Sequence, residues 1–227
     1  MMSKIRILAL GDCNTSGAKG TAYSHNLPQS VCKLLSKNGV QCELQNLGYT
    51  MSTSREGVMR AKIQAKPADI LLLNFGLVDA WVTSIPAIYI SYYPNNKLKS
   101  LARKLLKSIK KRLQHPRIRK ICPRGHVVNR DEFKRNLATI IKEVKTVSPK
   151  VRLIIWGCPP TYHDLERNHH LAEYDKIMKG ISDDFEGRFI NTREILKEHL
   201  IEETYQDNVH LSLKGCDVIA AEIFTLI

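Results

Sequence analysis

The fold class depends on one stretch near the N-terminus, Ile5-Arg6-Ile7-Leu8-Ala9-Leu10-Gly11-Asp12-Cys13-Asn14. Residues 5–10 are short and mostly apolar, and Gly11-Asp12 ends the run, which predicts a buried strand followed by a tight turn. Because Arg6 interrupts the apolar run before it reaches the roughly 7–15 residues of a secretory signal, we expect no signal peptide here. The polar turn therefore follows directly after a buried strand, where sites form in parallel sheets.

Strands and helices alternate along the rest of the chain. Further strands are expected at 40–47, 69–75, 151–156 and 188–190, and helices at 21–37, 54–65, 131–148, 171–181 and 213–224. Asn38-Gly39 is expected to end the first helix, and Ser54 to cap the second, with Glu56 in its first turn. This alternation predicts a three-layer α/β/α fold around a central, mostly parallel five-stranded sheet.

The composition fits a single domain over 1–227. The chain is 43% hydrophobic and 25% charged, which is typical of a globular protein with a sizeable core. No stretch approaches the ~20 apolar residues of a membrane-spanning helix, so we expect a cytoplasmic protein, with peripheral membrane association as an option. The six cysteines form no CxxC pair, and most are expected to be small buried residues, with Cys13 set aside as a candidate for chemistry.

The irregular segment 82–128 follows the third strand and carries most of the positive charge. Eleven Lys and Arg residues lie between Lys97 and Lys120, which leaves +2 of the net charge of +13 for the rest of the chain. Leucine and isoleucine recur among them at helical spacing from Leu98 to Leu113, which predicts a cationic amphipathic helix. The helix either packs on the domain or lies on an anionic membrane surface. Nucleic acid is disfavoured because interleaved aromatic residues and reading motifs are lacking.

Polar clusters recur at the predicted strand ends. They are Gly11-Asp12-Cys13-Asn14, Gly48, Gly76-Leu77-Val78-Asp79, and Asp207-Asn208-Val209-His210 before the last helix. In this order they resemble the blocks of the SGNH/GDSL hydrolases, over nearly the whole chain. The resemblance implies the flavodoxin-like fold of that family and acyl-ester hydrolysis without a cofactor or metal.

The resemblance also assigns roles to residues. Cys13 stands where the family has its nucleophilic serine, and the backbone N–H groups of Cys13 and Gly48 are expected to form the oxyanion hole. Asp207 can orient His210 through Nδ1, which leaves Nε2 as general base. Substrate-binding roles are expected for Asp12, Asn14, Gly76 and Asp79.

Two positions depart from the family pattern. Cys13 replaces serine, and we expect His210 and a helix N-terminus to lower its pKa and make it a competent nucleophile. The alternatives are an inert Cys13 in a site that only binds, or Ser16 as a displaced nucleophile. Val78 replaces the asparagine that donates to the oxyanion, and Asn14 or Asn74 is a candidate substitute.

Several residues also have simpler interpretations. Asp12 can serve as a turn-former and Asp79 as a cap for the segment after the third strand. Trp81 and Trp156 are more typical of a core or pocket wall than of a sugar platform. His25, His126, His163, His169 and His170 form no tight ligand pattern, so a metal site is not expected.

A looser likeness narrows the expected substrate. Gly-x-Val-Asp at 76–79 and the segment Val128 to Leu137, which ends in Phe133-Lys134-Arg135-Asn136-Leu137, resemble members associated with bacterial surface-polysaccharide synthesis. This likeness implies an acylated sugar or glycolipid as substrate. The alternatives are an O-acyltransferase and a non-catalytic glycan- or lipid-binding module on the same fold.

Overall fold

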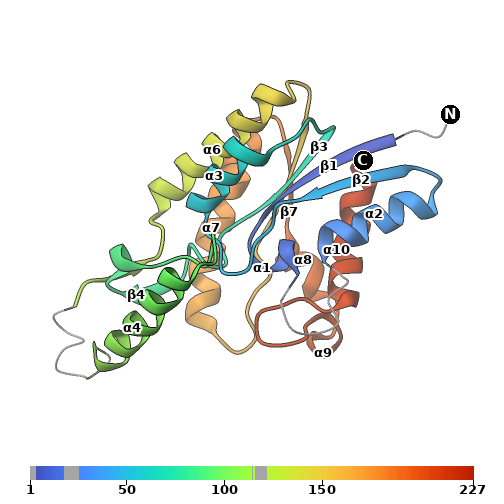
Figure 1. The fold of residues 1–227 in the computed structure, drawn as a ribbon. Helices are drawn as coiled ribbons and strands as arrows, with labels where there is room; N and C mark the ends of the chain where they lie inside the picture. Colours follow the sequence, from blue (N-terminus) through green and yellow to red (C-terminus); the bar gives the residue numbers. More distant parts are fainter. Residues whose placement is uncertain (1–3, 18–25, 114, 116–121) are drawn as a thin grey trace.

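The computed structural model describes residues 4–17, 26–113, 115 and 122–227 (Figure 1). At its centre lies a five-stranded sheet in the order β2-β1-β3-β6-β7, and every neighbouring pair is parallel. Its strands are β1 (Lys4–Gly11), β2 (Gln41–Asn46), β3 (Ile70–Asn74), β6 (Arg152–Trp156) and β7 (Arg188–Ile190). The predicted three-layer fold with a five-stranded parallel sheet is confirmed.

Helices cover both faces of the sheet (Figure 1). One face packs against α2 (Leu27–Lys37) and α10 (Leu213–Thr225), and the other against α3 (Ser54–Gln64), α6 (Arg130–Val147) and α7 (Leu165–Asp184). Successive residues of a strand point to opposite faces, so Ile7 joins the core under α2 and α10 while Leu8 joins the core under α3, α6 and α7. The central strands are therefore apolar on both sides.

Some element boundaries differ from the prediction. The first helix begins at Leu27 after the cap Asn26, and residues 18–25 of the predicted helix lie outside the described residues. Thr53, not Ser54, is the N-cap of α3, and its backbone N–H donates to Glu56 at 2.8 Å. Helix α7 begins six residues earlier than expected because the Asp164 side chain accepts the backbone N–H of Arg167 and caps it.

Short elements complete the carboxyl edge of the sheet. They are α1 (Cys13–Ser16), α8 (Thr192–Lys197) and α9 (Ile201–Thr204). None of the three was predicted, because a helix of four to six residues shows no full period in the sequence.

The insertion after β3 forms a unit of its own beside the sheet (Figure 1). Strands β4 (Val82–Ser84) and β5 (Arg124–His126) pair antiparallel, with η1 (Pro86–Ile88) and α4 (Lys97–Leu113) between them. No described residue of α4 is buried, and Leu98, at 80% exposure, shares its exposed stripe with Leu101, Leu105 and Ile109. This stripe is therefore open to solvent, whereas Leu106 and Leu113 of the predicted apolar face are half-buried and Arg103 donates to the carbonyl of Ser91.

Two cysteines differ from the expectation. Cys32 and Cys42 form a disulfide between α2 and β2, whereas Cys158 and Cys216 are free and buried as expected. Cys13 is also free and buried, and Cys122 is free and half-buried. Within the described ranges, no helix is both long and apolar enough to cross a membrane.

Candidate active site

The candidate general base, His210, and the carboxylate that orients it lie within one tight turn before α10. Asp207 Oδ2 lies 2.7 Å from His210 Nδ1, and Asp207 Oδ1 accepts the backbone N–H groups of Val209 and His210, each at 2.8 Å. Partial burial acts to raise the pKa of Asp207, but these hydrogen bonds from His210 and Val209 outweigh it and hold the pKa below its usual value. The carboxylate is therefore ionised and fixes the imidazole with Nδ1 as the proton-bearing nitrogen.

The opposite nitrogen of His210, Nε2, has different surroundings. Nε2 is buried and forms no hydrogen bond with any described residue. A general base needs a nitrogen of this kind, oriented by a carboxylate and free to take a proton. The predicted contact between Asp207 and His210 is thus present in the structure.

Asn14 links this turn to the end of β1. Its Oδ1 accepts the backbone N–H of Leu211 at 3.1 Å, and its Nδ2 donates to the carbonyl of Val209 at 3.4 Å. Both residues flank His210, so the amide of Asn14 holds the base next to the Cys13 turn. Asn14 is buried and uses its amide in this link, which leaves it poorly placed as the expected substrate ligand or substitute oxyanion donor.

Cys13 is the first residue of α1 and only 3% exposed. Burial raises the pKa of its thiol to about 12, the charge of Asp12 adds to this, and the hydrogen bond from the Met51 backbone N–H to Sγ, at 3.2 Å, opposes it. The expectation of a lowered thiol pKa was wrong, since α1 is only four residues long and His210 forms no hydrogen bond to Sγ among the described residues. At rest, Cys13 is a neutral thiol.

The hydroxyl of Ser16, the alternative nucleophile, is already engaged. It donates towards the carbonyls of Cys13, at 3.1 Å, and Gly17, at 3.0 Å, and lies 3.3 Å from the Thr50 hydroxyl. No hydrogen bond joins it to His210 in the described part of the chain. The geometry therefore favours Cys13 over Ser16 as the residue that His210 would serve.

Gly48 lies against α1, as the family pattern implies. A Cβ atom at this position would be 2.6 Å from the Ser16 backbone nitrogen, so only glycine allows the approach. Its backbone N–H, however, donates to Asn46 Oδ1 at 2.8 Å. In this conformation the N–H is not free for an oxyanion, which differs from the predicted role.

The loop that follows Gly48 is held by a buried arginine, Arg60. Its guanidinium donates to the carbonyl of Leu47 and to the hydroxyl of Ser52, the latter at 2.5 Å. Burial lowers the pKa of Arg60 to about 10, so the side chain remains charged at neutral pH. This residue was not predicted, because nothing in its sequence neighbourhood distinguishes it from a surface arginine of a helix.

Asp12 and Asp79 are both fully buried beneath the site. Asp12 accepts the backbone N–H groups of Asn14 and Leu77, each at 3.3 Å, and Asp79 accepts the N–H and hydroxyl of Ser54 at 2.9 and 2.6 Å. Neither carboxylate faces a substrate as predicted. Asp12 forms the turn, and Asp79 holds the start of α3 instead of capping its own segment.

Burial also changes the ionisation of this pair. It raises the pKa of Asp12 to about 7, with a contribution from the charge of Asp79, and raises that of Asp79 to about 6. Gly76, three residues before Asp79, has a φ of 125°, and a Cβ there would meet Cys158 Sγ at 2.6 Å. Gly76 is therefore a turn residue required by the backbone, not an exposed substrate contact.

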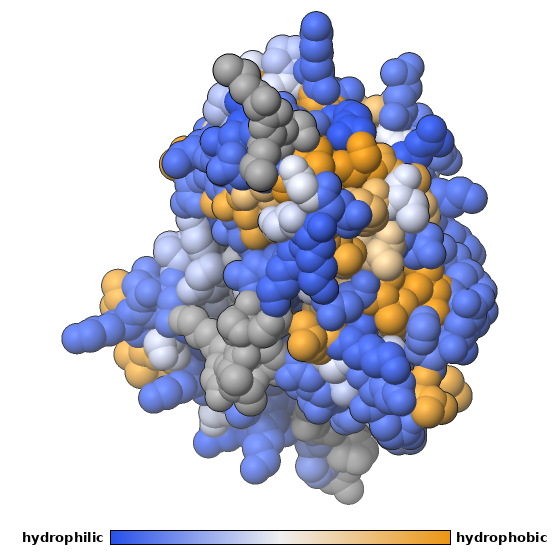
Figure 2. Space-filling view, turned by 90° about the vertical axis from the view of Figure 1, so that its right-hand side faces the viewer, coloured by the Kyte–Doolittle hydropathy of each residue, from blue (hydrophilic) through white to orange (hydrophobic). Residues whose placement is uncertain are grey.

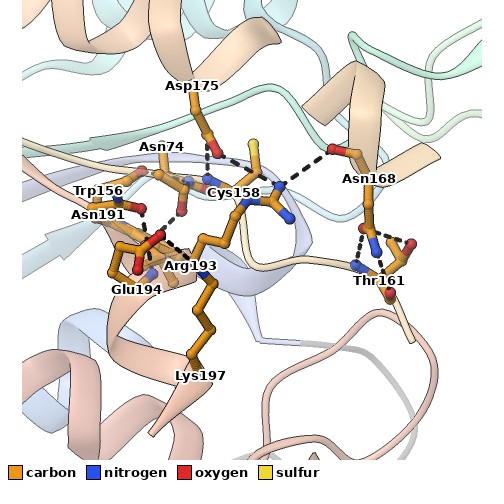
Figure 3. A network of polar contacts seen from close by, with 12 residues as sticks. Asn74, Trp156, Cys158, Thr161, Asn168, Asp175, Asn191, Arg193, Glu194 and Lys197 are labelled. Atoms are coloured by element: carbon orange, nitrogen blue, oxygen red, sulfur yellow. Dashed lines mark hydrogen bonds and ion pairs between the residues drawn. The ribbon is translucent and has the colours of Figure 1, made fainter. Parts of the chain in front are cut away.

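Asn74, the other substitute donor considered for Val78, is also committed. Its Nδ2 donates to the carbonyls of Trp156, at 2.7 Å, and Gly157, at 3.2 Å (Figure 3). Val78 itself is buried. Neither Asn14 nor Asn74 thus has an amide directed at the position where the family asparagine donates.

The loop after β6 borders a cavity of about 680 Å³ at the same edge of the sheet. Thr161, Asn168 and Arg193 line it and are joined by hydrogen bonds, including Thr161 N to Asn168 Oδ1 at 2.6 Å (Figure 3). Tyr162 in its wall donates its backbone N–H to the carbonyl of Asn208, at 2.9 Å, within the Asp207–His210 turn. This hydrogen bond joins the wall of the cavity to the turn that carries Asp207 and His210.

The two tryptophans have different surroundings. Trp156 is buried in the core under α2 and α10, whereas Trp81 is exposed beside a smaller cavity near α7.

In the described part of the chain, no group of three His, Cys, Asp or Glu side chains is placed to hold a metal ion. His25 lies outside that part.

Asn136 gives the segment 128–137 a structural explanation. Phe133 and Leu137 are buried in the core, and Asn136 Nδ2 donates to Ser54 Oγ at 2.9 Å. Ser54 in turn binds Asp79, so α6 is joined to the floor of the site.

Several solved structures share this fold. The chain is similar to an acetylxylan esterase from Geobacillus stearothermophilus, with a TM-score of 0.67, 18% identity, and coverage of 99% of this chain and 94% of the other. A lipase/acylhydrolase from Enterococcus faecalis has a TM-score of 0.65, 21% identity, and coverage of 98% and 95%. A comparison with curated proteins found no match.

The sequence comparison with family models is more specific. Residues 9–218 match the model of the GDSL-like lipase/acylhydrolase family. That range contains the Cys13 turn, Gly48, the 76–79 segment and the Asp207–His210 pair. With the site geometry, it shows that the chain belongs to the GDSL-like lipase/acylhydrolase family and is an esterase-type hydrolase.

Proposed function

We propose that this protein removes acyl groups from a carbohydrate or glycolipid, with Cys13 as nucleophile, His210 as base and Asp207 as the residue that orients the base. The observation that carries the proposal is the Nε2 of His210, which is buried without a hydrogen-bond partner among the described residues. Asp207 holds its imidazole, and Asn14 links it to the Cys13 turn. An idle site has no need for an imidazole prepared in this way.

The reaction would proceed through a thioester. As Sγ attacks the acyl carbonyl carbon, its proton passes to His210 Nε2, and His210 then returns a proton to the departing alcohol oxygen. Water, activated by the same nitrogen, would cleave the thioester and release the acid. A sugar hydroxyl in place of water would make the protein an O-acyltransferase.

Two features support a carbohydrate-type substrate. The cavity of about 680 Å³ is joined to the catalytic turn through the backbone of Tyr162 and has Tyr162 and Arg193 in its lining as partners for a sugar. The segment 128–137 and the Gly-x-Val-Asp block resemble members associated with bacterial surface-polysaccharide synthesis. A cytoplasmic location would suit the deacylation of a precursor in such a pathway.

The first test is hydrolysis of p-nitrophenyl acetate by wild type, Cys13→Ala, Cys13→Ser and His210→Ala. We expect activity in wild type and loss in both alanine variants. Cys13→Ser reports whether the site accepts the usual nucleophile of the family. Unchanged activity in Cys13→Ala would contradict the proposed nucleophile.

A non-catalytic binding module is the second candidate. It is favoured by the burial of Cys13, which is 3% exposed and accepts a hydrogen bond from the Met51 N–H, because this burial raises the pKa of the thiol. It predicts no hydrolysis by wild type. Activity gained on Cys13→Ser alone would then identify a hydrolase site disarmed by cysteine.

We also propose that α4 binds an anionic membrane surface. Its exposed stripe of Leu98, Leu101, Leu105 and Ile109 lies among lysines and arginines, with no acidic residue in the helix. The face away from α4 is mostly hydrophilic, with apolar side chains in separate patches (Figure 2). In contrast, the stripe on α4 combines exposed apolar side chains with positive charge, the two properties that favour binding to anionic lipid.

Sedimentation with vesicles of phosphatidylcholine and phosphatidylglycerol at low salt tests this surface. We expect wild type to sediment and the double variant Leu101→Asp, Leu105→Asp to remain in solution. Leu200→Asp, at a position 65% exposed outside the insertion, is the control and should behave as wild type. Equal sedimentation of all three would contradict the proposal.

A further inference from the structure

Among the described residues, the donors that the family pattern names for the oxyanion are not free. The side chain of Val78 has no donor, the N–H of Gly48 is bound to Asn46, and the amides of Asn14 and Asn74 are used in backbone contacts. When an acyl carbonyl is attacked, the negative charge on its oxygen needs hydrogen-bond donors. A hydrolase with this site therefore needs a donor that the family pattern does not name.

Arg167 approaches the position of the missing donor. It lies in the first turn of α7, and its Nη2 donates to the carbonyl of Leu77, the residue before Val78, at 3.1 Å. The N–H of Leu77 in turn donates to Asp12, next to Cys13. The guanidinium of Arg167 thus extends from α7 to the backbone that follows the carboxyl end of β3.

One N–H group of the Arg167 guanidinium makes no hydrogen bond to the described residues. Its Nε is buried and has no hydrogen-bond partner among the described residues. The side chain borders a small cavity of about 130 Å³ together with Ala80, Trp81 and His170. A buried N–H of a cation without a partner is costly, and an anionic oxygen is the partner that best satisfies it.

The charge of Arg167 also reaches the nucleophile. Burial lowers the pKa of Arg167 itself, and its positive charge acts to lower the pKa of both Cys13 and Asp12. Negative charge that develops at Cys13 is therefore stabilised from this direction.

We propose that Arg167 is the oxyanion donor that replaces the family asparagine. As Sγ of Cys13 bonds to the acyl carbon and its proton moves to His210, the carbonyl electron pair moves onto oxygen, and a guanidinium N–H donates to that oxygen. Collapse of the intermediate restores the C=O bond and expels the alcohol. The inference rests on the proposed acyl-transfer function.

The test measures kcat and KM for p-nitrophenyl acetate in Arg167→Met, Arg167→Lys and the double variant Arg167→Met, Val78→Asn. We expect Arg167→Met to lower kcat by about 10²–10³-fold with little change in KM, and Arg167→Lys to lower it less. The double variant should recover at least about tenfold of the loss, because the introduced asparagine restores the family donor. A merely structural arginine would show no such rescue.

Arg152→Met is the matched control. Arg152 also donates to a backbone carbonyl, that of Ile227 at 3.0 Å, but at the opposite end of β6 from the site. The kcat of Arg152→Met should equal that of wild type. Thermal unfolding of every variant separates loss of the fold from loss of the donor.

The outcomes distinguish the two proposals. Wild-type hydrolysis that persists in Arg167→Met, or a loss that Val78→Asn does not repair in a folded protein, would overturn this inference and leave the proposed function standing. Absence of hydrolysis in both wild type and Cys13→Ser would overturn the proposed function and this inference with it.

Discussion

The turn that carries the base and the turn that carries the nucleophile are built in different ways. Asp207 and His210 are three residues apart and make their contacts within their own turn. Cys13 instead takes its hydrogen bond from Met51, 38 residues away, and its buried negative neighbour is Asp12. A local motif carries its geometry with it, whereas the reactivity of a buried thiol depends on whatever the rest of the chain packs around it.

Removal of the base should have the largest effect on activity. We expect His210→Ala to lower kcat/KM for an acyl ester by about 10²–10⁴-fold, the usual contribution of a positioned base. His169→Ala is the control, because His169 is exposed on α7. A rate equal to that of wild type in His210→Ala would break the comparison, since the prepared turn would then contribute nothing.

The pH dependence of the rate should distinguish the two turns. Because burial raises the pKa of Cys13 to about 12, its thiolate becomes about tenfold more abundant for each pH unit between about pH 7 and 10. If the attack required a preformed thiolate, kcat/KM would follow this rise. We expect instead a wild-type profile that stays nearly level over this range, as in Cys13→Ser, because the proposed mechanism passes the Sγ proton to His210 during the attack. A tenfold rise per pH unit in wild type alone would contradict that step.

A single methyl group should disturb the nucleophile turn. Gly48→Ala would place Cβ 2.6 Å from the Ser16 nitrogen and 2.8 Å from the Thr15 carbonyl carbon, both backbone atoms of α1. We expect a loss of about 3 kcal/mol in the free energy of unfolding, measured with urea. Gly180→Ala, in α7 with open space around it, should instead gain about 0.5–1 kcal/mol. Equal effects would show that α1 can move aside.

The buried carboxylates under the nucleophile should make stability depend on pH. Burial raises the pKa of Asp79 to about 6, so the folded state binds this proton more tightly than the unfolded state. The resulting stabilisation is complete below about pH 4 and is lost as the pH rises through about 6, by roughly 2–3 kcal/mol. Asp79→Asn should remove this part of the slope in urea unfolding curves, and an unchanged slope would assign it to Asp12.

The fold was largely predictable, because apolar runs and helical periodicity in the sequence mark the central strands and the long helices. The strand 188–190 has the predicted bounds, and the other central strands differ by a few residues. Helix α7 was predicted too short, because the Asp164 cap precedes its apolar residues. The three helices of four to six residues gave no periodic signal.

The site was predictable only in part, for the same reason. The contact between Asp207 and His210 follows from a spacing of three residues, and the structure contains it. The approach of Arg167 to Leu77 spans 90 residues and has no motif. The direction of the Cys13 pKa shift likewise depends on burial by residues far apart in the sequence, which the motif alone does not reveal.

The link from Asn14 to Leu211 has a consequence for how the protein is made. The two residues are 197 positions apart, and their hydrogen bond joins the first strand to the turn before the last helix. A growing chain that has emerged from the ribosome as far as β7 can already contain every strand of the sheet, yet it has no base beside Cys13. Ester hydrolysis would therefore begin only once translation has passed His210 and that turn has docked, so that enzyme activity reports the docking of this turn and not merely the formation of the sheet.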